Sequence, residues 1–553
     1  MLSQLDGRKK INLIALLVGA GILLVVGWKM FWFLTDDAYI SFRYVSNSIL
    51  GHGYVWNAAP FRPVEGYTNF LWIILLDVVW RIFKVSPPES ANFISLVFSF
   101  LTFMVVSAGI LQLRWSRKLH PHRIVILGLV LLGLVVNRTV LTWSSSGLET
   151  AMFNFFLILW IYICVFVPIT SRWWVVSLTS LAVCIYLTRP DGILFLASTL
   201  LLLGWTFIRN RDIFRMRHLA GASPLLLVLS HIVWRRATYG EWLPNTYYAK
   251  FTGSWPESGA RHLLSFILEY SLWVWIGLAL YVLIKRLVKP SPRETVERAS
   301  RRTAVFVVTV TLLAHLLYYT IMIGGDHFEY RIFSHLIFLV FLSFVWFLNN
   351  GRIKPTASII MLIVFITLSL PVPWTHWAHT HDLNTREETH KLRYPVAPHW
   401  PGPVRWYANL FDEQQSWLID HYVCVRHQEH KVNCEYLISL FPSRASGLKL
   451  HTGDYPVLAF PAIGVASWVL PQVNIIDLHG LNDYVIARNP PEDTGMRMMA
   501  HDRSAPEGYV QCFMPNVQLR GKKDLVIHER RQPLTAADII ECETRWAETV
   551  RTR

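Results

Sequence analysis

The sequence predicts a polytopic α-helical membrane protein of about eleven transmembrane helices, followed by a C-terminal α/β or α+β domain. Three observations predict this class: a hydrophobic content of 53%, a charged content of only 16%, and a succession of long apolar runs. Soluble proteins usually carry about 25% charged residues. We therefore assign residues 1–373 to the membrane and residues 374–553 to a soluble domain.

The first apolar run, 11–33, is long enough to cross a hydrocarbon core of about 30 Å. The basic residues 8–10 before it resemble the start of a signal peptide, but the run is too long and no small-residue cleavage site follows it. We interpret it as a retained first span. The other predicted spans are 91–113, 124–141, 149–168, 173–188, 192–208, 219–234, 263–284, 303–323, 332–348 and 356–372.

The distribution of Lys and Arg predicts the orientation. Residues 1–373 hold 33 Lys and Arg against 16 Asp and Glu, whereas residues 374–553 hold 19 against 21. With a cytoplasmic N-terminus, all the basic connections fall inside, as the positive-inside rule requires. They are 114–123, 171–174, 209–218, 285–302 and 349–354. The net charge of +15 thus reflects membrane topology, and we predict no nucleic acid partner, a plasma-membrane location and an extracytoplasmic C-terminal domain.

One apolar segment, 70–83, is excluded from the spans. It is only about fourteen residues long and carries Asp77 and Arg81, which are four residues apart and can pair on one helix face. Counting it as a span would reverse every later helix. We predict an amphipathic helix in the outer interface, within a first outer loop at 34–90; a short span is the alternative.

The C-terminal 180 residues are polar, with strand-like runs such as 456–478 between turn signals. Four of the six cysteines lie there, and an oxidising outer compartment would permit disulfides. We predict the pairs Cys424–Cys434 and Cys512–Cys542.

Polar segments converge on the predicted outer face at 35–44, 61–70, 142–151, 187–192, 239–250 and 324–331. Ionisable groups at the edge of the hydrocarbon are costly and usually functional. Carboxylates act as general bases, Arg and Lys bind phosphate, and aromatic rings offer flat faces to sugars and lipid headgroups. This combination predicts transfer of a group from a lipid phosphate to a hydroxyl acceptor.

Asp36 and Asp37 are the candidate catalytic residues, and we slightly favour Asp36. Repulsion between adjacent carboxylates raises one pKa, which suits a base. The alternative is that a carboxylate caps the helix that follows.

Arg189, Arg331 and Lys250 are the candidates for binding the donor phosphate. The alternative for Arg331 is pairing with Asp326 or Glu329. The alternative for Arg189 is pairing with Asp191 or snorkelling to the interface. The candidate sugar or acceptor contacts are Glu65, Tyr67, Asn69, Glu149, Asn245, Tyr247 and Asp326; the two glutamates could instead cap helices.

Seven motifs occur in an order that is typical of one family. They are the pair Asp36-Asp37, VEGYTN (64–69), SSGLET (145–150), TRPDG (188–192), LPNTYYAK (243–250), GGDHFEYR (324–331) and NIIDLHGLNDYVIAR (474–488). The chain resembles the multi-span glycosyltransferases of the C-type (GT-C) fold. It is most similar to the terminal arabinofuranosyltransferases of mycobacterial cell walls and their bacterial relatives.

The resemblance implies a catalytic carboxylate in the first outer loop, a polyprenyl-phosphate sugar donor that enters from the bilayer, and a C-terminal domain near the acceptor. The chain is shorter than the mycobacterial enzymes and more aromatic at 64–69. We therefore expect transfer of a sugar, a pentofuranose being one candidate, to an envelope glycan, lipid or protein. No residue spacing predicts a metal site or another cofactor, although some GT-C enzymes use a divalent cation.

Two other functions remain open. A transporter or flippase of lipid-linked or polar cargo would also concentrate charge in the membrane, but near the midplane and often in repeated halves. A receptor or assembly scaffold would act through the outer C-terminal domain.

Overall fold

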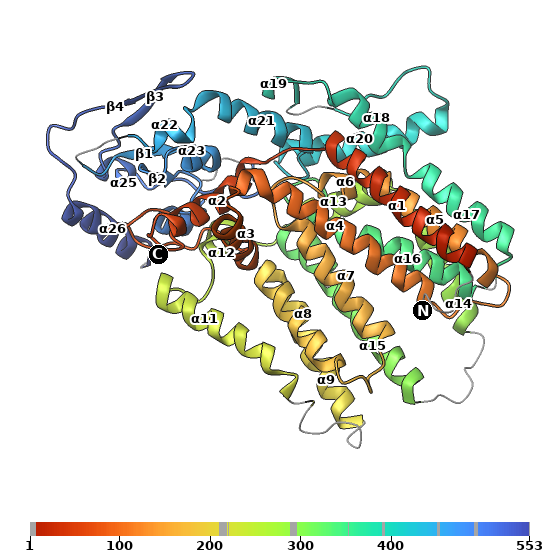
Figure 1. The fold of residues 1–553 in the computed structure, drawn as a ribbon. Coiled ribbons are helices and arrows are strands. Elements are labelled where there is room, and N and C mark those ends of the chain that lie inside the picture. Colours follow the sequence, from red (N-terminus) through yellow and green to blue (C-terminus); the bar gives the residue numbers. More distant parts are fainter. Residues whose placement is uncertain are drawn as a thin grey trace.

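The computed structural model describes residues 7–209, 218, 220–287, 296–351, 353–389, 393–450, 454–491 and 496–551. Most of the chain up to residue 380 is helical, and long helices pack side by side into a bundle (Figure 1). Ten predicted spans each coincide with one helix or its larger part. These helices are α1 (Gly7–Met30), α4 (Pro87–Gln112), α5 (Arg123–Val135), α7 (Thr150–Phe166), α8 (Trp174–Thr188), α9 (Ile193–Arg209), α11 (Leu226–Tyr239), α15 (Val296–Leu317), α16 (Ser334–Asn350) and α17 (Pro355–Leu368).

Fewer helices than the predicted eleven are long enough to cross a membrane alone. Within the described ranges, six helices meet the requirements of length and apolar composition, and one bent pair brings the number to seven. Three shorter apolar helices accompany them: His120–Val135, Thr150–Phe166 and Trp174–Thr188. The class of a multi-pass helical membrane protein therefore holds.

The predicted span at 263–284 is broken and not one continuous helix. Two helices occupy it, α13 (Pro256–Glu269) and α14 (Trp273–Leu287), and they are bent by 90° at their junction. Ser271 lies in the break with φ of 48°, a left-handed conformation that ends an α-helix. Its hydroxyl donates a hydrogen bond to the carbonyl oxygen of Leu368 at 2.9 Å, which ties the break to α17.

The segment between α1 and α4 contains α2 (Asp36–Ile49) and α3 (Phe70–Phe83). The bounds of α3 match the predicted helix, and the predicted pair forms, with Arg81 Nε 3.0 Å from Asp77 Oδ2. Its interfacial position remains a prediction. In Figure 1, α2 and α3 lie among the blue C-terminal elements, at one end of the bundle.

The predicted domain boundary after residue 373 falls inside α18 (Pro371–Thr380). Beyond it the chain alternates helices with two small sheets. The elements are α19 (Arg386–Thr389), α20 (Gly402–Asp420), α21 (His427–Leu440), α22 (Arg444–Gly447), β1 (Val457–Phe460), α23 (Ile463–Val469), β2 (Asn474–Asp477), α24 (Tyr484–Arg488), α25 (Tyr509–Cys512), β3 (Val517–Gly521), β4 (Asp524–Ile527) and α26 (Ala536–Arg551).

The two sheets have different topologies. Strands β1 and β2 pair in parallel, with Val457 opposite Asn474 and Phe460 opposite Asp477, so β1–α23–β2 is a βαβ unit. Strands β3 and β4 form an antiparallel hairpin. Residues of α2 and of the βαβ unit share one apolar core, which includes Phe42 and Val465. The first loop and the C-terminal region therefore pack against each other through a shared apolar core.

The structure confirms one predicted disulfide and not the other. Cys512 and Cys542 are bonded, which joins α25 to α26. Cys424 and Cys434 are both buried and free, so this predicted pair is wrong. The segment between them becomes helical at His427, and Cys434 packs within α21 instead.

Candidate active site

Two cavities lie where the bundle meets the C-terminal region. Cavity A has about 1430 Å³ of empty space, including its open mouth. It is lined by the first turns of α2, by α12 (Asn245–Lys250), by the cap residues next to α7 and α8, by the π-helical turn Tyr318–Ile323 after α15 and by the loop 324–331. Cavity B, with about 1330 Å³, lies between α2 and the C-terminal region. The two share the lining residues Asp37, Ile40, Lys250, His327, Leu481 and Ala500.

Asp37 stands at this shared boundary because of how α2 begins. The preceding residues form a bridge between Leu34 and Ser146, and the amide of Thr35 donates to the carbonyl oxygen of Ser146 at 3.1 Å. Thr35 is the N-cap residue of α2, so neither carboxylate caps its own helix. The Asp37 carboxylate forms no hydrogen bond or ion pair with any described residue and is half-buried. It is therefore free to act on a ligand in either cavity.

Asp36 has a different environment from its neighbour. Its two carboxylate oxygens accept hydrogen bonds from the amides of Val465 (2.7 Å) and Gly464 (3.1 Å) in the first turn of α23. It lines cavity B but not cavity A. Burial raises the pKa of Asp36 to about 7, although the two amides oppose this shift.

Arg331 and Asp326 lie at opposite ends of the loop 324–331 and form a two-point ion pair. Arg331 Nε lies 2.8 Å from Asp326 Oδ2, and Nη2 lies 3.0 Å from Oδ1. This is the first of the two pairings considered for Arg331. Both side chains line cavity A, and the Arg331 Nη1 group makes no hydrogen bond within the described chain. One edge of the guanidinium is thus available to an anion.

Arg189 is more fully engaged. Its Nε donates to Asp191 at 3.1 Å, Nη1 lies 3.5 Å from Glu149, and Nη2 donates to the hydroxyl of Tyr319 at 2.9 Å. The predicted alternative pairing with Asp191 is therefore present. Arg189 lines cavity A, where it contributes positive charge while each of its three nitrogen atoms is already bonded to the protein.

Lys250 is the last residue of α12 and lines both cavities. Its ammonium group has no hydrogen bond or ion pair with any residue that the structure describes. Burial lowers the pKa of Lys250, and the negative charge of Asp37 acts in the opposite direction. A cation that is not neutralised by a protein partner is well suited to bind an anionic ligand.

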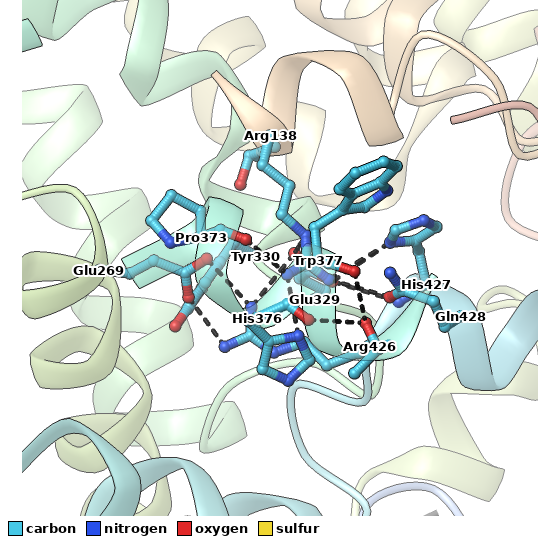
Figure 2. Close-up of polar contacts among 12 residues, drawn as sticks. Arg138, Glu269, Glu329, Tyr330, Pro373, His376, Trp377, Arg426, His427 and Gln428 are labelled. Atoms are coloured by element: carbon cyan, nitrogen blue, oxygen red, sulfur yellow. Dashed lines mark hydrogen bonds and ion pairs between the residues drawn. The ribbon is translucent and has the colours of Figure 1, made fainter. Parts of the chain in front are cut away.

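The loop 324–331 is held by a buried ionic network at Glu329. Its carboxylate contacts Arg138 of α6 (Arg138–Thr142) at 3.1 Å and Arg426 at 3.2 Å, and it accepts the amide of His427 at 3.1 Å. Arg426 also pairs with Glu269 of α13 at 2.8 Å. Figure 2 shows these groups pointing toward one another from the bundle and from the C-terminal region. The network fixes the loop that presents Asp326, His327 and Arg331 to the cavities.

The remaining predicted contacts fall into two groups. Tyr67, Asn69, Glu149, Tyr247 and Asp326 line cavity A. Glu65 and Asn245 do not line either cavity.

Those two side chains hold the walls together instead. Glu65 accepts two hydrogen bonds from Arg235, at 2.6 and 3.1 Å. The Asn245 amide donates to three carbonyl oxygens of residues 480–483. Neither glutamate caps a helix through a side-chain bond: Glu149 occupies the N-cap position of α7 without one.

Sequence reasoning did not identify the polar wall of cavity B. This wall contains His430, His479, His501, Glu429 and Asp477. Burial lowers the pKa of His501 to about 3 and raises the pKa of Asp477. The motif at 474–488 could have indicated Asp477 and His479, which lie at the carboxyl end of β2. The other residues of this wall lie in separate segments of the sequence and share no motif.

The described residues contain no group of three or more His, Cys, Asp or Glu side chains arranged to hold a metal ion.

The bundle, with its polar cavity at one end and its C-terminal region of helices and two small sheets, has a fold similar to that of the solved structure of ArnT from Cupriavidus metallidurans. This likeness in fold agrees with the GT-C fold predicted from the motifs. No family model matches the sequence.

Individual relatives are distant. The structure of ArnT from Cupriavidus metallidurans bound to undecaprenyl phosphate is similar, with a TM-score of 0.50 and 13% identity over 84% of this chain and 85% of that chain. The apo state of ArnT gives 0.48 and 13% identity over 86% and 91%. The terminal β-(1→2)-arabinofuranosyltransferase of Corynebacterium glutamicum is 25% identical over 347 residues, which are 57% of this chain and 48% of that protein. The chain thus spans about half the length of the curated relative it matches.

Proposed function

We propose that the protein is a membrane glycosyltransferase that moves a sugar from polyprenyl phosphate to an acceptor hydroxyl at the outer face of the plasma membrane. The observation that carries the proposal is the position of Asp37. Its unbonded carboxylate lines the boundary between two cavities, of about 1430 and 1330 Å³ of empty space. A transferase with two substrates needs such a place, where the acceptor hydroxyl can reach both a base and the donor carbon.

In this mechanism, the donor sugar phosphate occupies cavity A and the acceptor enters through cavity B. The acceptor oxygen attacks the anomeric carbon while Asp37 accepts the hydroxyl proton. The bond between that carbon and the phosphate oxygen breaks, and polyprenyl phosphate leaves. The protein contributes mainly position, proton transfer and charge, because phosphate is already a good leaving group.

Lys250 and Arg331 are the groups that stabilise the leaving phosphate. Lys250 has no partner among the described residues at the shared boundary, and Arg331 keeps one guanidinium edge unused while Asp326 fixes the other. Arg189 contributes further positive charge, although it is paired with Glu149 and Asp191. Exposed Tyr247 and the neighbouring Leu243, 45% and 43% accessible, supply an apolar rim for a prenyl chain.

The likeness to an arabinofuranosyltransferase favours a pentofuranose as the donor sugar. The acceptor belongs to the cell envelope and is a glycan, a lipid or a protein. The similar structure of ArnT, which has undecaprenyl phosphate bound, favours a donor lipid of the same chemistry.

The test uses the full-length protein in lipid nanodiscs with a panel of radiolabelled polyprenyl-phosphate sugars, pentofuranose and hexopyranose, and an envelope fraction from cells that lack the protein. Label should pass from the lipid into the envelope fraction for one donor, with release of polyprenyl phosphate. The proposal is overturned if no donor yields a glycosidic product. Movement of intact donor across a vesicle membrane, without product, would identify the transporter alternative.

A further inference from the structure

Helix α2 contacts both ends of α23, the helix inside the C-terminal βαβ unit. At the start of α23, Asp36 accepts the amides of Gly464 and Val465, at 3.1 and 2.7 Å. Amides in the first turn of a helix have no partner within the helix and carry partial positive charge. A carboxylate from another element therefore satisfies them well.

Arg43 occupies the other end of the same helix. Its Nη1 group donates to the carbonyl oxygens of Ser467 (3.0 Å) and Leu470 (3.1 Å), and Nη2 donates to that of Val473 (3.0 Å). The side chain is 2% exposed, so these bonds are made away from water. The carbonyl groups at a helix end are unpaired and partly negative, and a guanidinium suits them.

The spacing of the two charged residues matches the length of α23. Asp36 and Arg43 are seven residues apart on α2, which is two helical turns or about 10.5 Å. Helix α23 also has seven residues. The two helices therefore run parallel, with the Asp36 carboxyl group at the start of α23 and the Arg43 guanidinium at its end.

Gly464 permits this close approach. A Cβ atom at position 464 would lie 1.8 Å from the backbone carbonyl oxygen of Asp36, well inside contact distance. The first turn of α23 thus lies directly on the backbone of α2. Even the smallest side chain at this position would force the two helices apart.

The position of α23 determines one wall of cavity B. The residues just before and at its start, Pro461, Ala462 and Ile463, line the cavity. So do Asp477 and His479, at the carboxyl end of the strand that follows α23. The adjoining part of the wall is the first turn of α2, which carries Asp37. The contact between α2 and α23 therefore fixes how these two parts of the wall lie relative to each other.

We propose that Asp36 and Arg43 are positioning residues that clamp α23 against α2 and so fix the wall of the acceptor cavity beside Asp37. This inference rests on the proposed function, because it takes cavity B as the acceptor site. It separates the roles of two adjacent carboxylates. Asp37 is the base, and Asp36, with both oxygens occupied by amides, fixes the geometry.

The first experiment needs no substrate. Hydrogen exchange of the full-length protein in nanodiscs is compared for the wild type, Asp36→Asn, Asp37→Asn and Gly464→Ala. In the peptide 462–470, hydrogen exchange should become faster in Asp36→Asn and Gly464→Ala and stay unchanged in Asp37→Asn. In the bundle helices, exchange should stay unchanged in all three variants. The clamp is overturned if Asp36→Asn leaves the exchange of 462–470 as it is in the wild type.

The second experiment separates KM from kcat with the envelope fraction as acceptor. Asp36→Asn and Gly464→Ala should raise the acceptor KM by about 10-fold or more, equivalent to about 1.4 kcal/mol, with the donor KM unchanged and transfer retained at saturating acceptor. Loss of transfer at saturating acceptor in Asp36→Asn would instead make Asp36 the base and overturn the inference. Full activity in Asp37→Asn would contradict the proposed mechanism alone, since the exchange result does not depend on it.

Discussion

Asp37 and Lys250 lie at the same boundary between cavities A and B, and neither side chain is paired with a described residue. The carboxylate of Asp37 raises the pKa of Lys250 against the lowering effect of burial, so the two groups sense each other's charge. Arg189 and Arg331, by contrast, are both engaged in ion pairs in cavity A. An anion and a cation that line the same two cavities, neither neutralised by a described residue, are available to a ligand that carries a hydroxyl and a phosphate.

Replacing Asp37 with Asn should abolish most of the transfer. An amide of the same size cannot accept the acceptor proton, and loss of a general base usually costs about 10²- to 10⁴-fold in rate. We expect kcat to fall by that amount while the donor KM changes little. The measurement is the initial rate of label transfer from polyprenyl-phosphate sugar by purified protein in nanodiscs.

The matched control is Asp412→Asn, on α20, at a carboxylate that lines neither cavity and bonds to Tyr394 and Ser416. It should keep the wild-type rate. A thermal unfolding curve of Asp37→Asn is measured as well, to establish that the variant is folded. Wild-type kcat in a folded Asp37→Asn protein would exclude this residue as the base.

Replacing Lys250 with Met should weaken binding of the lipid phosphate. A hydrogen bond to a charged group contributes about 1.5–3 kcal/mol, so the Kd for undecaprenyl phosphate should rise by about 10- to 100-fold. Arg331→Met should act in the same direction and should also release Asp326. Binding is measured by the ligand-dependent rise in unfolding temperature of the detergent-solubilised protein.

Undecaprenol, which lacks the phosphate, is the control ligand, and the variants should bind it as the wild type does. Lys431→Met is the control variant, because Lys431 lies 3.9 Å from Glu435 on the exposed side of α21. Equal loss of affinity for the alcohol and the phosphate would show that Lys250 does not contact the phosphate.

The convergence of Asp37, Arg189, Lys250 and Arg331 was predictable from sequence because all four follow or precede apolar spans that end on one side. Once the basic loops set the orientation, the polar segments had to meet at the opposite face. The number of full-length spans was less predictable, because hydropathy does not register a local break such as the left-handed Ser271.

The difference between the environments of Asp36 and Asp37 was not predictable. It depends on two amides more than 400 residues away, and no local pattern reports them. Glu65 and Asn245 were assigned to the ligand for the same reason: their partners are distant in sequence and already satisfy them. A sequence motif identifies polar residues of structural or functional importance. Only the three-dimensional structure shows which of their side chains lack a protein partner and can contact a ligand.

Replacing Glu329 with Gln should destabilise the protein. The carboxylate is 0% exposed and lies between Arg138 and Arg426. Its loss would leave the buried charge of Arg138 without a carboxylate partner, whereas Arg426 would keep Glu269. Breaking a buried pair in this way costs about 3–5 kcal/mol of unfolding free energy. The measurement is the unfolding temperature in detergent, followed through tryptophan fluorescence.

Glu435→Gln is the matched control for this change. Its partner Lys431 is also solvent-accessible, and exposed pairs contribute about 0–1 kcal/mol. The control should unfold close to the temperature of the wild type. If Glu329→Gln unfolds at the same temperature as Glu435→Gln, the network in Figure 2 does not stabilise the fold.

The pH dependence of stability should change when Asp36 becomes Asn. The pKa of Asp36 is raised to about 7 by burial, while the unfolded value is near 3.8. Between these values the folded protein retains a proton that the unfolded chain has released, so stability is highest at low pH and is lost as pH rises toward 7. One such group contributes a slope of about 1.4 kcal/mol per pH unit.

Unfolding temperatures of the wild type and Asp36→Asn are therefore compared at half-unit steps from pH 5 to pH 8. The wild type should lose stability relative to the variant as pH rises from 5 to 7, and the difference should level off above 7. Parallel curves across the whole range would mean that Asp36 titrates as it does in water.

The disulfide between Cys512 and Cys542 should be required for the C-terminal region to keep α26 in place. It closes a loop with a sequence separation of 30 residues, for which removal costs roughly 3–4 kcal/mol. We expect the double variant Cys512→Ser, Cys542→Ser to lose protection from proteolysis in α26 before any other helix.

Maleimide labelling of the denatured protein should modify four cysteines without reduction and all six after it, because the other four are free. Six labelled cysteines without reduction would show that the bond is absent, and with it the support for an oxidising compartment around this domain.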